Sequence, residues 1–364
     1  FLDHGFDISV VGEGEQTALE IAEHVNNQDM DWSKINGIVY RNSNNEIIQN
    51  PPREYLDISN LPLPAYNKVD MKGYVGMWDG IIRGLPLRGA LIMSSRGCPY
   101  ACTFCDCNKV FGQHVRYRSL ENIEQEVQLL KQTYGVEGIW LADDTFTLNK
   151  EHILGVGKIM KKHKMIWGCQ ARVNLVDEKL IKTMKKLGCI QFDLGVESGS
   201  QRVLDEVMNK KTNLDQVRQA FRLCHKYKIR TLANLMMGLP TESKEEMEQT
   251  MDLAREIKAN FYVFSIFTPL PGTTLFDKYY KNEIDYRDYK ELNFFAGIER
   301  FNKSKVKDLK TLNTEWRKEL AMRMKKSNLT LHYVFLYLKI FFKLKHKKKR
   351  LQFVLKKVLN LIRK

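Results

Sequence analysis

Three cysteines stand close together in the chain with the spacing C-x3-C-x2-C, at Cys98, Cys102 and Cys105. Thiolates are soft ligands that select zinc or iron–sulfur centres. Gly97 and Pro99 supply the turn chemistry that a tight loop needs if three sulfurs are to converge. The spacing therefore predicts a metal or cluster site on a single loop.

The number of ligands separates the kinds of site. A structural zinc site takes four protein ligands, and an ordinary four-iron cluster takes four cysteines. Cys107 could be a fourth ligand, although its direction would be awkward. A cluster on three thiolates leaves one iron open, as catalysis needs. The competing interpretation is a zinc loop or scattered core cysteines, and Phe104 just before the last cysteine disfavours it. The remaining cysteines are expected to fill the core: Cys169, Cys189 and Cys224.

Short apolar runs rich in β-branched and aromatic residues alternate with amphipathic stretches between about residues 90 and 280. Alternation at this spacing favours parallel strands joined by right-handed helical crossovers. Six units are fewer than a complete eight-unit barrel requires, so the pattern suits a partial barrel or an open doubly wound sheet. The predicted strands are 90–94, 138–142, 165–171, 190–196, 229–237 and 261–267.

Polar residues follow the later runs, at the edge where barrel enzymes place their sites. Taken singly, each has an ordinary explanation, such as a carboxylate near a helix start or a serine cap. Their shared position at one edge favours a common cavity. They include Asp143 and Asp144 after the second run, Arg172 after the third, Glu197 and Ser198 after the fourth, and Gly238 after the fifth.

The chain resembles the radical S-adenosylmethionine enzymes over residues of about 85–285. The resemblance lies in a C-x3-C-x-(aromatic)-C motif that follows the first strand of a six-unit partial barrel. The resemblance implies a partial (β/α)6 barrel and a 4Fe–4S cluster on Cys98, Cys102 and Cys105. It also implies that S-adenosylmethionine chelates the open iron and is cleaved reductively to a 5′-deoxyadenosyl radical.

The resemblance also implies how the cofactor is held. Phe104 is expected on the adenine side, and Gly238 permits close backbone approach to adenine. Glu197 and Ser198 match a motif that meets the ribose or the carboxylate. Basic groups suit the carboxylate. The family often has Gly-Gly-Glu at the end of the second strand, where it contacts the ammonium of S-adenosylmethionine. This chain has Asp143 and Asp144 there instead, so its contact with the ammonium departs from the family pattern. The expected cofactor-binding residues are Phe104, Asp143, Asp144, Arg172, Glu197, Ser198, Lys210 (or Lys211 in its place) and Gly238.

The N-terminal segment carries Gly12-Glu-Gly-Glu15, several prolines between 51 and 64, and Tyr74. Together these resemble the subfamily with an N-terminal cobalamin-binding domain. The chain starts with Phe1 rather than Met, so we expect it to be truncated and the cobalamin-cradling residues to lie upstream. The predicted domains are a remnant of an α/β domain (1–25), a hairpin and proline-rich connector (26–85), the radical core (86–285) and a C-terminal extension with basic amphipathic helices (286–364).

The predicted function is radical chemistry on an unidentified small-molecule or lipid-like substrate, by cobalamin-dependent methyl transfer or oxidative cyclisation. The family further implies an electron donor such as flavodoxin or ferredoxin. One alternative is a methylthiotransferase acting on RNA or protein, which should carry extra cysteines before the barrel, and residues 1–97 contain none. Another is a non-catalytic iron–sulfur or zinc protein with a nucleic-acid-binding or membrane-binding tail.

The net charge of +15 belongs to the C-terminal end of the chain. After residue 320 there are 14 Lys and Arg and no acidic residue, which leaves 44 basic against 43 acidic residues before it. The apolar run 331–342 is too short to span a bilayer. It suits an amphipathic helix on an anionic membrane surface, or a solvated helix packed on the barrel. We expect a cytoplasmic protein, peripheral on the inner membrane face if the tail binds lipid, and no specific nucleic acid.

Overall fold

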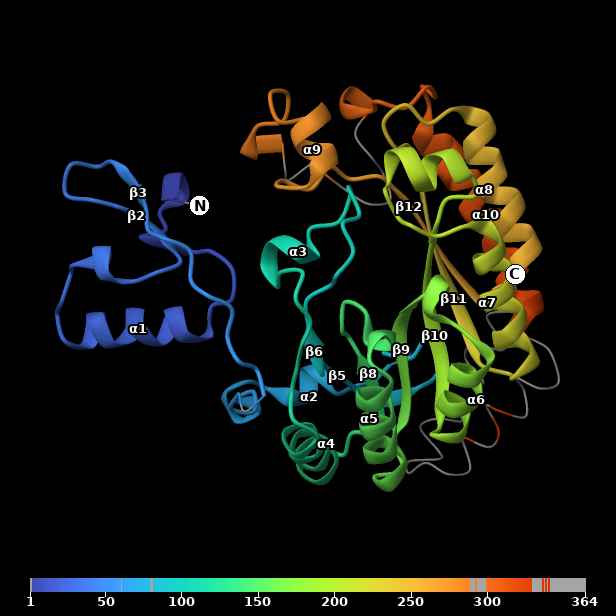
Figure 1. The fold of residues 1–364 in the computed structure, drawn as a ribbon, viewed down its shortest axis with the longest axis horizontal. Coiled ribbons are helices and arrows are strands. Elements are labelled where there is room, and N and C mark those ends of the chain that lie inside the picture. Colours follow the sequence, from blue (N-terminus) through green and yellow to red (C-terminus); the bar gives the residue numbers. More distant parts are fainter. Residues whose placement is uncertain are drawn as a thin grey trace.

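The centre of the molecule is a curved sheet in which six parallel strands follow one another in chain order (Figure 1). The computed structural model describes residues 2–59, 61–78, 81–288, 292, 299–328, 336, 338 and 340. The six strands coincide with the six predicted apolar runs, which confirms the partial (β/α)6 barrel. They are β5 (Leu87–Ile92), β8 (Gly138–Leu141), β9 (Ile166–Arg172), β10 (Cys189–Glu197), β11 (Arg230–Met237) and β12 (Phe261–Ile266).

One further strand lies at the edge of this sheet. The short strand β4 (Met77–Trp78) pairs antiparallel with β5. The sheet order is therefore β12-β11-β10-β9-β8-β5-β4. This strand lies in the predicted proline-rich connector, because two residues are too few to show the alternation of a strand.

Helices follow the parallel strands and cover the outer face of the sheet (Figure 1). Five of them begin at an N-cap residue whose side chain accepts a backbone N–H of the first turn: Ser119, Asn149, Asp177, Asn213 and Ser243. The last two complete capping boxes with the residue three positions on. The helices are α4 (Leu120–Tyr134), α5 (Lys150–Lys162), α6 (Glu178–Lys186), α7 (Leu214–Lys226) and α8 (Lys244–Ile257).

Strand β10 shows how the sheet separates its two faces. Phe192, Leu194 and Val196 are completely buried and belong to the core cluster that includes side chains of the outer helices. The alternate residues Asp193 and Glu197 are only partly buried. Because successive side chains point to opposite faces of a strand, the inner face of the half-barrel is the polar, accessible one.

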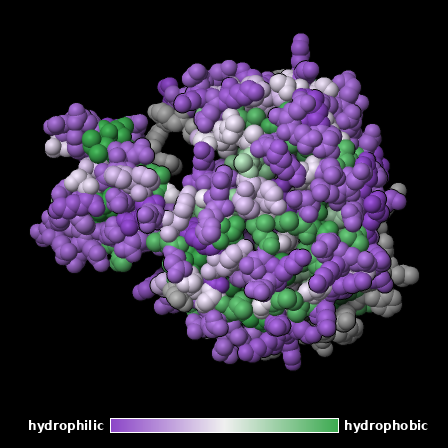
Figure 2. Space-filling model, in the orientation of Figure 1, coloured by the Kyte–Doolittle hydropathy of each residue, from purple (hydrophilic) through white to green (hydrophobic). Residues whose placement is uncertain are grey.

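The N-terminal unit is a three-stranded antiparallel sheet with one helix. Its parts are β1 (Ile8–Val10), α1 (Glu15–Asn26), β2 (Ile38–Arg41) and β3 (Ile47–Gln49). Strand β1 pairs antiparallel with β2, which places parts of the predicted segments 1–25 and 26–85 in one sheet. The predicted domain boundary between these segments stays a prediction. Apolar patches interrupt the hydrophilic surface of this unit at the left of Figure 2. Its exposed apolar side chains include Phe6, Leu19, Val25, Met30 and Ile47.

After the barrel come α9 (Thr274–Tyr279) and the long helix α10 (Leu309–Asn328). In α10, Leu309, Trp316 and Leu320 are buried against the body, and the helix lies beside α8 (Figure 1). Sequence periodicity did not reveal this helix. The basic helices predicted beyond it lie almost wholly outside the described residues. Within the described part of the chain, no helix combines the length and apolar character needed to cross a membrane.

Candidate functional site

The cysteine motif lies on a loop whose two ends are joined by a short antiparallel pair, β6 (Ser95–Arg96) and β7 (Arg116–Tyr117). Gly97 has a φ of +97°, and a Cβ there would lie 2.4 Å from the carbonyl oxygen of His114. The Cys98 amide donates to the carbonyl of Gly112 at 3.1 Å. The loop therefore turns sharply at a position that only glycine can occupy. Its first two cysteines lie beside residues at the carboxyl ends of β8 and β9.

The three motif cysteines are all half-buried. The Cys98 sulfur lies 3.4 Å from the hydroxyl of Thr145, at the end of the second barrel strand. The Cys102 sulfur accepts a hydrogen bond from Arg172 Nη1 at 3.5 Å. Cys102 and Cys105 line a cavity of about 440 Å³ that also reaches Tyr55 of the connector. Two of the three motif cysteines thus line a space large enough for a small ligand.

Cys107, which begins the short helix α3 (Cys107–Val110), lies beside Cys105. Its hydrogen bond lowers the pKa of the Cys105 thiol to about 7, although burial acts the other way, and the same contact raises the pKa of Cys107. Among the described residues, ligand atoms of Cys105, Asp106 and Cys107 gather within 4.8 Å of one another, whereas the three motif sulfurs do not. Sulfurs bound to one tetrahedral zinc would lie about 3.8 Å apart. The three motif sulfurs are therefore not placed as ligands of one tetrahedral zinc would be.

The end of β8 holds the entrance of the cysteine loop. Asp143 is completely buried and accepts three hydrogen bonds at 2.6 Å, from the Ser94 amide and from the hydroxyls of Ser94 and Ser95. Burial raises its pKa although these bonds act against that shift. Asp144 is partly exposed and accepts from the Gly97 amide at 3.2 Å. Of this predicted pair, only Asp144 has exposed surface with which to meet a cofactor.

Arg172 ends β9 and packs directly on the cysteine loop. Its Cζ lies 3.6 Å from the ring centroid of Tyr100, within the range of a cation–π contact. Arg172 also donates to the Lys210 carbonyl and, at 3.3 Å, to Asn174 Oδ1. The predicted site residue is therefore held next to the thiolates and to a second predicted basic residue.

Glu197 and Lys210 form a buried ion pair at 2.8 Å, and their side chains are 12% and 5% exposed. Glu197 has a φ of +67°, a backbone conformation that non-glycine residues rarely adopt. Such strain persists where the surroundings enforce it, and it clusters at functional sites. Lys210 Nζ lies 5.8 Å from the ring centroid of Phe104. The structure thus brings these three predicted residues together, whereas Lys211 is exposed.

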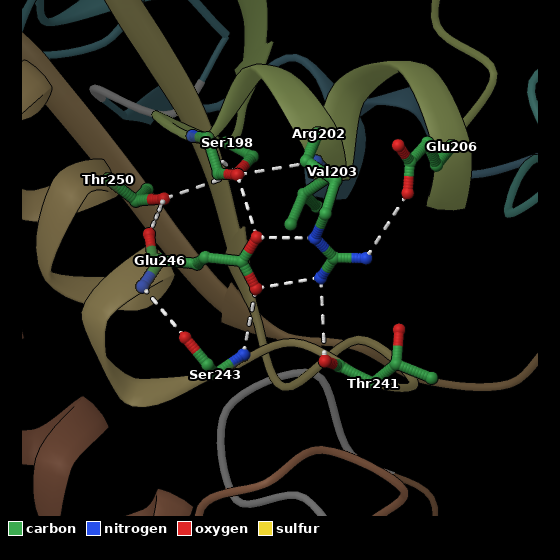
Figure 3. Close-up of polar contacts among 9 residues, drawn as sticks. Ser198, Arg202, Val203, Glu206, Thr241, Ser243, Glu246 and Thr250 are labelled. Carbon is green, nitrogen blue, oxygen red and sulfur yellow. Dashed lines mark hydrogen bonds and ion pairs between the residues drawn. The ribbon is translucent and has the colours of Figure 1, made fainter.

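Ser198 is completely buried and lies in a network that ties the end of β10 to α8 (Figure 3). Its hydroxyl lies 3.3 Å from that of Thr250 and accepts from the Ser200 amide at 3.1 Å. Nearby, Glu246 binds Arg202 with two contacts of 2.7 Å. The hydroxyl of Ser198 is thus engaged within the protein, and its contact with a cofactor stays a prediction.

Gly238 follows β11 with a φ of +80°, and a Cβ there would lie 2.6 Å from Leu309 Cδ1. Its amide and that of Leu239 donate to Oε2 of the completely buried Glu242, at 2.7 and 3.0 Å. The buried carboxyl group of Glu242 therefore shapes the turn at which we expected close approach to adenine.

Several residues of the site were not predicted. Tyr100 and Thr145 contact predicted residues, but an aromatic in a loop and a threonine after two aspartates carry no distinctive sequence signal. Glu13 forms ion pairs with Arg96 and Arg116 at the base of the cysteine loop, although it is far from both in sequence. Their only signal was the Gly-Glu-Gly-Glu stretch. The cysteines expected to fill the core do so: Cys169, Cys189 and Cys224 are completely buried.

Comparison with known proteins agrees with this geometry. Residues 92–254 match the model of the radical SAM superfamily, where SAM denotes S-adenosylmethionine. The chain is 31% identical over 310 residues to an uncharacterized methyltransferase of Pyrococcus horikoshii, covering 83% of this chain and 65% of that protein. It is 28% identical over 300 residues to the anaerobic magnesium-protoporphyrin IX monomethyl ester cyclase of Cereibacter sphaeroides, covering 80% of this chain and 47% of that one. The chain thus spans about half to two thirds of the length of these relatives.

A solved structure shows the same fold. The radical S-adenosylmethionine methyltransferase TsrM of Kitasatospora setae, solved with cobalamin and a [4Fe-4S] cluster bound, superposes with a TM-score of 0.61 at 18% identity. The match covers 76% of this chain and 54% of that one. The family match runs from the end of β5 into α8 and includes the cysteine loop, whereas β12 lies outside it. Residues 92–254 of this chain therefore belong to the radical SAM superfamily.

Proposed function

We propose that Cys98, Cys102 and Cys105 hold a 4Fe–4S cluster and that S-adenosylmethionine binds at its open iron. The supporting observation is the position of the three half-buried thiols, on a tight loop that follows the first parallel strand, with two of them lining a cavity. When bound, the cluster supplies one electron that cleaves a carbon–sulfur bond of S-adenosylmethionine and yields a 5′-deoxyadenosyl radical.

The protein's own task is to orient S-adenosylmethionine by its charges. Arg172 contacts the Cys102 sulfur and Lys210 lies beside Phe104, and we assign these two cations to the carboxylate. We assign Glu197 and Asp144 to the ribose and the ammonium, because both carboxylates lie at strand ends, Glu197 paired with Lys210 and Asp144 partly exposed. Phe104 lies beside Lys210 and is assigned to the adenine face. Asp143 and Ser198 are fully buried, so we give them supporting positions behind this set.

Anaerobic reconstitution with iron and sulfide tests this proposal. The protein should turn brown and absorb near ~400 nm, typical of thiolate-bound iron–sulfur centres. With dithionite and S-adenosylmethionine it should release 5′-deoxyadenosine or a methylated product, and a Cys102→Ala variant should do neither. A colourless protein that retains a single zinc ion would contradict the proposal.

We further propose that the reaction is cobalamin-dependent methyl transfer or oxidative cyclisation of a small molecule, with a flavodoxin-like or ferredoxin-like electron donor. Support comes from the relatives, which are named as a methyltransferase and a tetrapyrrole cyclase, and from TsrM, whose structure contains cobalamin. Methyl-labelled S-adenosylmethionine distinguishes the two reactions, because only methyl transfer moves the label into the product. Omitting cobalamin should abolish that transfer.

We also propose that the basic C-terminal segment contacts anionic lipid. Its lysines and apolar residues suit the surface of such a membrane. Flotation with vesicles containing phosphatidylserine should carry the protein upward at low salt and fail at high salt. Equal flotation at both salt concentrations, or none at either, would contradict this role.

A further inference from the structure

The base of the cysteine loop contains an unfavourable charge pair. In the β6–β7 pair, Arg96 and Arg116 stand directly opposite each other. Like charges at opposed positions of an antiparallel pair destabilise it. Both side chains are also largely buried, at 17% and 12% exposed. The two strands that close the cysteine loop therefore need a negative charge from elsewhere.

Glu13 supplies that charge from the N-terminal unit. Its side chain is 3% exposed and uses both oxygens, with Oε1 2.9 Å from Arg96 Nη1 and Oε2 2.7 Å from Arg116 Nη1. Glu15 adds a second contact to Arg96 at 2.5 Å. Two carboxylates thus balance two guanidinium groups, and one of the carboxylates bridges both strands.

The connector completes this arrangement. The Leu56 amide donates to Glu13 Oε2 at 3.0 Å, and the Leu56 carbonyl accepts from Arg116 Nη1 at 2.7 Å. The ring of Tyr55 lies 4.8 Å from Arg116 Cζ and packs so closely on Gly112 that a Cβ there would come within 2.6 Å of it. The same tyrosine lines the cavity beside Cys102 and Cys105.

The cysteine loop is in turn attached to these arginines. Arg116 Nη2 donates to the Phe111 carbonyl at 3.0 Å, and Arg96 Cζ lies 5.3 Å from the ring centroid of Phe111. A change at Glu13 can therefore reach the loop through two guanidinium groups that contact loop residues directly.

We propose that Glu13 is a positioning residue that holds the cysteine loop in its ligand-binding shape by neutralising Arg96 and Arg116. The shape of the loop follows from the contacts alone, whereas the consequence for the cluster rests on the proposed function. Removing one partner of a buried ion pair leaves an uncompensated buried charge, which is strongly destabilising. Without Glu13, Arg116 would lose its carboxylate partner and Arg96 would keep only Glu15, so the two guanidinium groups would face each other across the neck of the loop with one negative charge to balance them.

The test compares Glu13→Gln with Glu20→Gln. Glu20 is a matched control, because it lies on α1 in the same unit and binds an arginine, Arg53, away from the loop. Hydrogen exchange in the cluster-free protein is measured over residues 95–117, where the Cys98 amide bonds to Gly112. We expect this segment to exchange on the order of tenfold faster in Glu13→Gln, since a local loss of hydrogen-bonding partners lowers local stability, and to stay unchanged in Glu20→Gln.

Cluster retention supplies the second measurement. After reconstitution, the Glu13→Gln protein should lose its ~400 nm absorbance to an iron chelator several-fold faster than the control. Adding Arg96→Gln to Glu13→Gln should restore part of the difference, because it removes one of the two opposed charges. Rescue by neutralisation distinguishes this electrostatic role from general damage to the fold.

Exchange over 95–117 that is equal in Glu13→Gln and Glu20→Gln would overturn the inference. If Glu13→Gln fails to fold, Glu15→Gln serves instead and should give a smaller change of the same sign, because Glu15 contacts only Arg96 and is 43% exposed; no change there would also overturn it. If neither the unmodified chain nor any variant holds a cluster, the proposed function fails. The hydrogen-exchange result still decides whether Glu13 positions the cysteine loop.

Discussion

Arg172 Cζ lies 3.6 Å from the ring centroid of Tyr100, so the end of the third parallel strand packs directly on the cysteine loop. The same guanidinium donates to the Cys102 sulfur at 3.5 Å. A planar side chain with several donors can stack and hydrogen-bond at once. Arg172 therefore links the strand ends that should bind S-adenosylmethionine to the loop that should bind iron.

Replacing Arg172 by lysine tests this link. Lysine keeps the charge but loses the stacked plane and the donor fork, contributions of about 0.5–2 kcal/mol and about 1.5–3 kcal/mol. We expect Arg172→Lys to raise the KM for S-adenosylmethionine by roughly tenfold or more. Tyr100→Phe keeps the ring and serves as the control, with a KM close to that of the unmodified chain. An unchanged KM in Arg172→Lys would show that the stack is incidental.

Single cysteine substitutions should separate ligands from neighbours. Cys98→Ser, Cys102→Ser and Cys105→Ser should each lose most of the about four irons per chain expected of the cluster. Cys107→Ser should keep them, although Cys107 contacts Cys105 in the cluster-free protein. Iron and acid-labile sulfide analysis after reconstitution measures this. Loss of iron in Cys107→Ser with retention in Cys98→Ser would transfer the ligand assignment to the Cys105–Cys107 pair.

The strand–helix alternation was readable from the sequence, because buried parallel strands are apolar and helix caps are local. The cysteine spacing was readable because it lies within eight consecutive residues. Burial of polar side chains was not readable: Asp143 and Asp144 are adjacent in sequence, yet one is completely buried and the other is partly exposed. The pairing of β1 with β2 and the contacts of Glu13 were also hidden, because both depend on partners far along the chain.

Substitutions of the two adjacent aspartates, Asp143 and Asp144, should have different effects, one on the stability of the fold and the other on the binding of S-adenosylmethionine. Asp143→Ala removes the acceptor of three buried donors, of which the Ser94 hydroxyl still has His152 Nε2 at 2.9 Å, and each donor left without an acceptor costs about 1–3 kcal/mol. We therefore expect it to lower the free energy of unfolding by at least ~2 kcal/mol. Asp144→Ala removes one longer hydrogen bond at a partly exposed site, so it should change stability little and weaken S-adenosylmethionine binding. Urea unfolding and equilibrium binding measure the two effects, and similar stability losses in both variants would contradict this division.

Glu242 should give the protein a pH-dependent stability. Its side chain is completely buried, and no protein partner of Oε1 is found among the described residues. Burial raises its pKa from 4.5 to about 8, although hydrogen bonds from the amides of Leu239 and Gly238 act against the shift. The folded chain therefore keeps a proton on Glu242 that the unfolded chain releases above pH 4.5.

The sign of the effect follows from this difference in bound protons. Between about pH 4.5 and 8 the folded state binds more protons at this site, so the free energy of unfolding should fall as the pH rises and should level off above 8. The total contribution is at most about 5 kcal/mol, from ~1.4 kcal/mol for each unit of pKa. Glu242→Gln cannot titrate, and its amide oxygen can still accept from the Gly238 and Leu239 amides. It should therefore lack this slope and gain stability relative to the unmodified chain above pH 8.

Urea unfolding at intervals between pH 5.5 and 8.5 measures this, with Glu246→Gln as the matched control. Glu246 has a pKa lowered to about 2, mainly by its hydrogen bonds with Arg202, so it stays ionised across that range. Losing it should lower stability but keep a slope, moved to lower pH because the charge of Glu246 helps to raise the pKa of Glu242. If the Glu242→Gln profile runs parallel to that of the unmodified chain, then Glu242 is ionised in the folded protein, and water or a cation must occupy the side of Oε1.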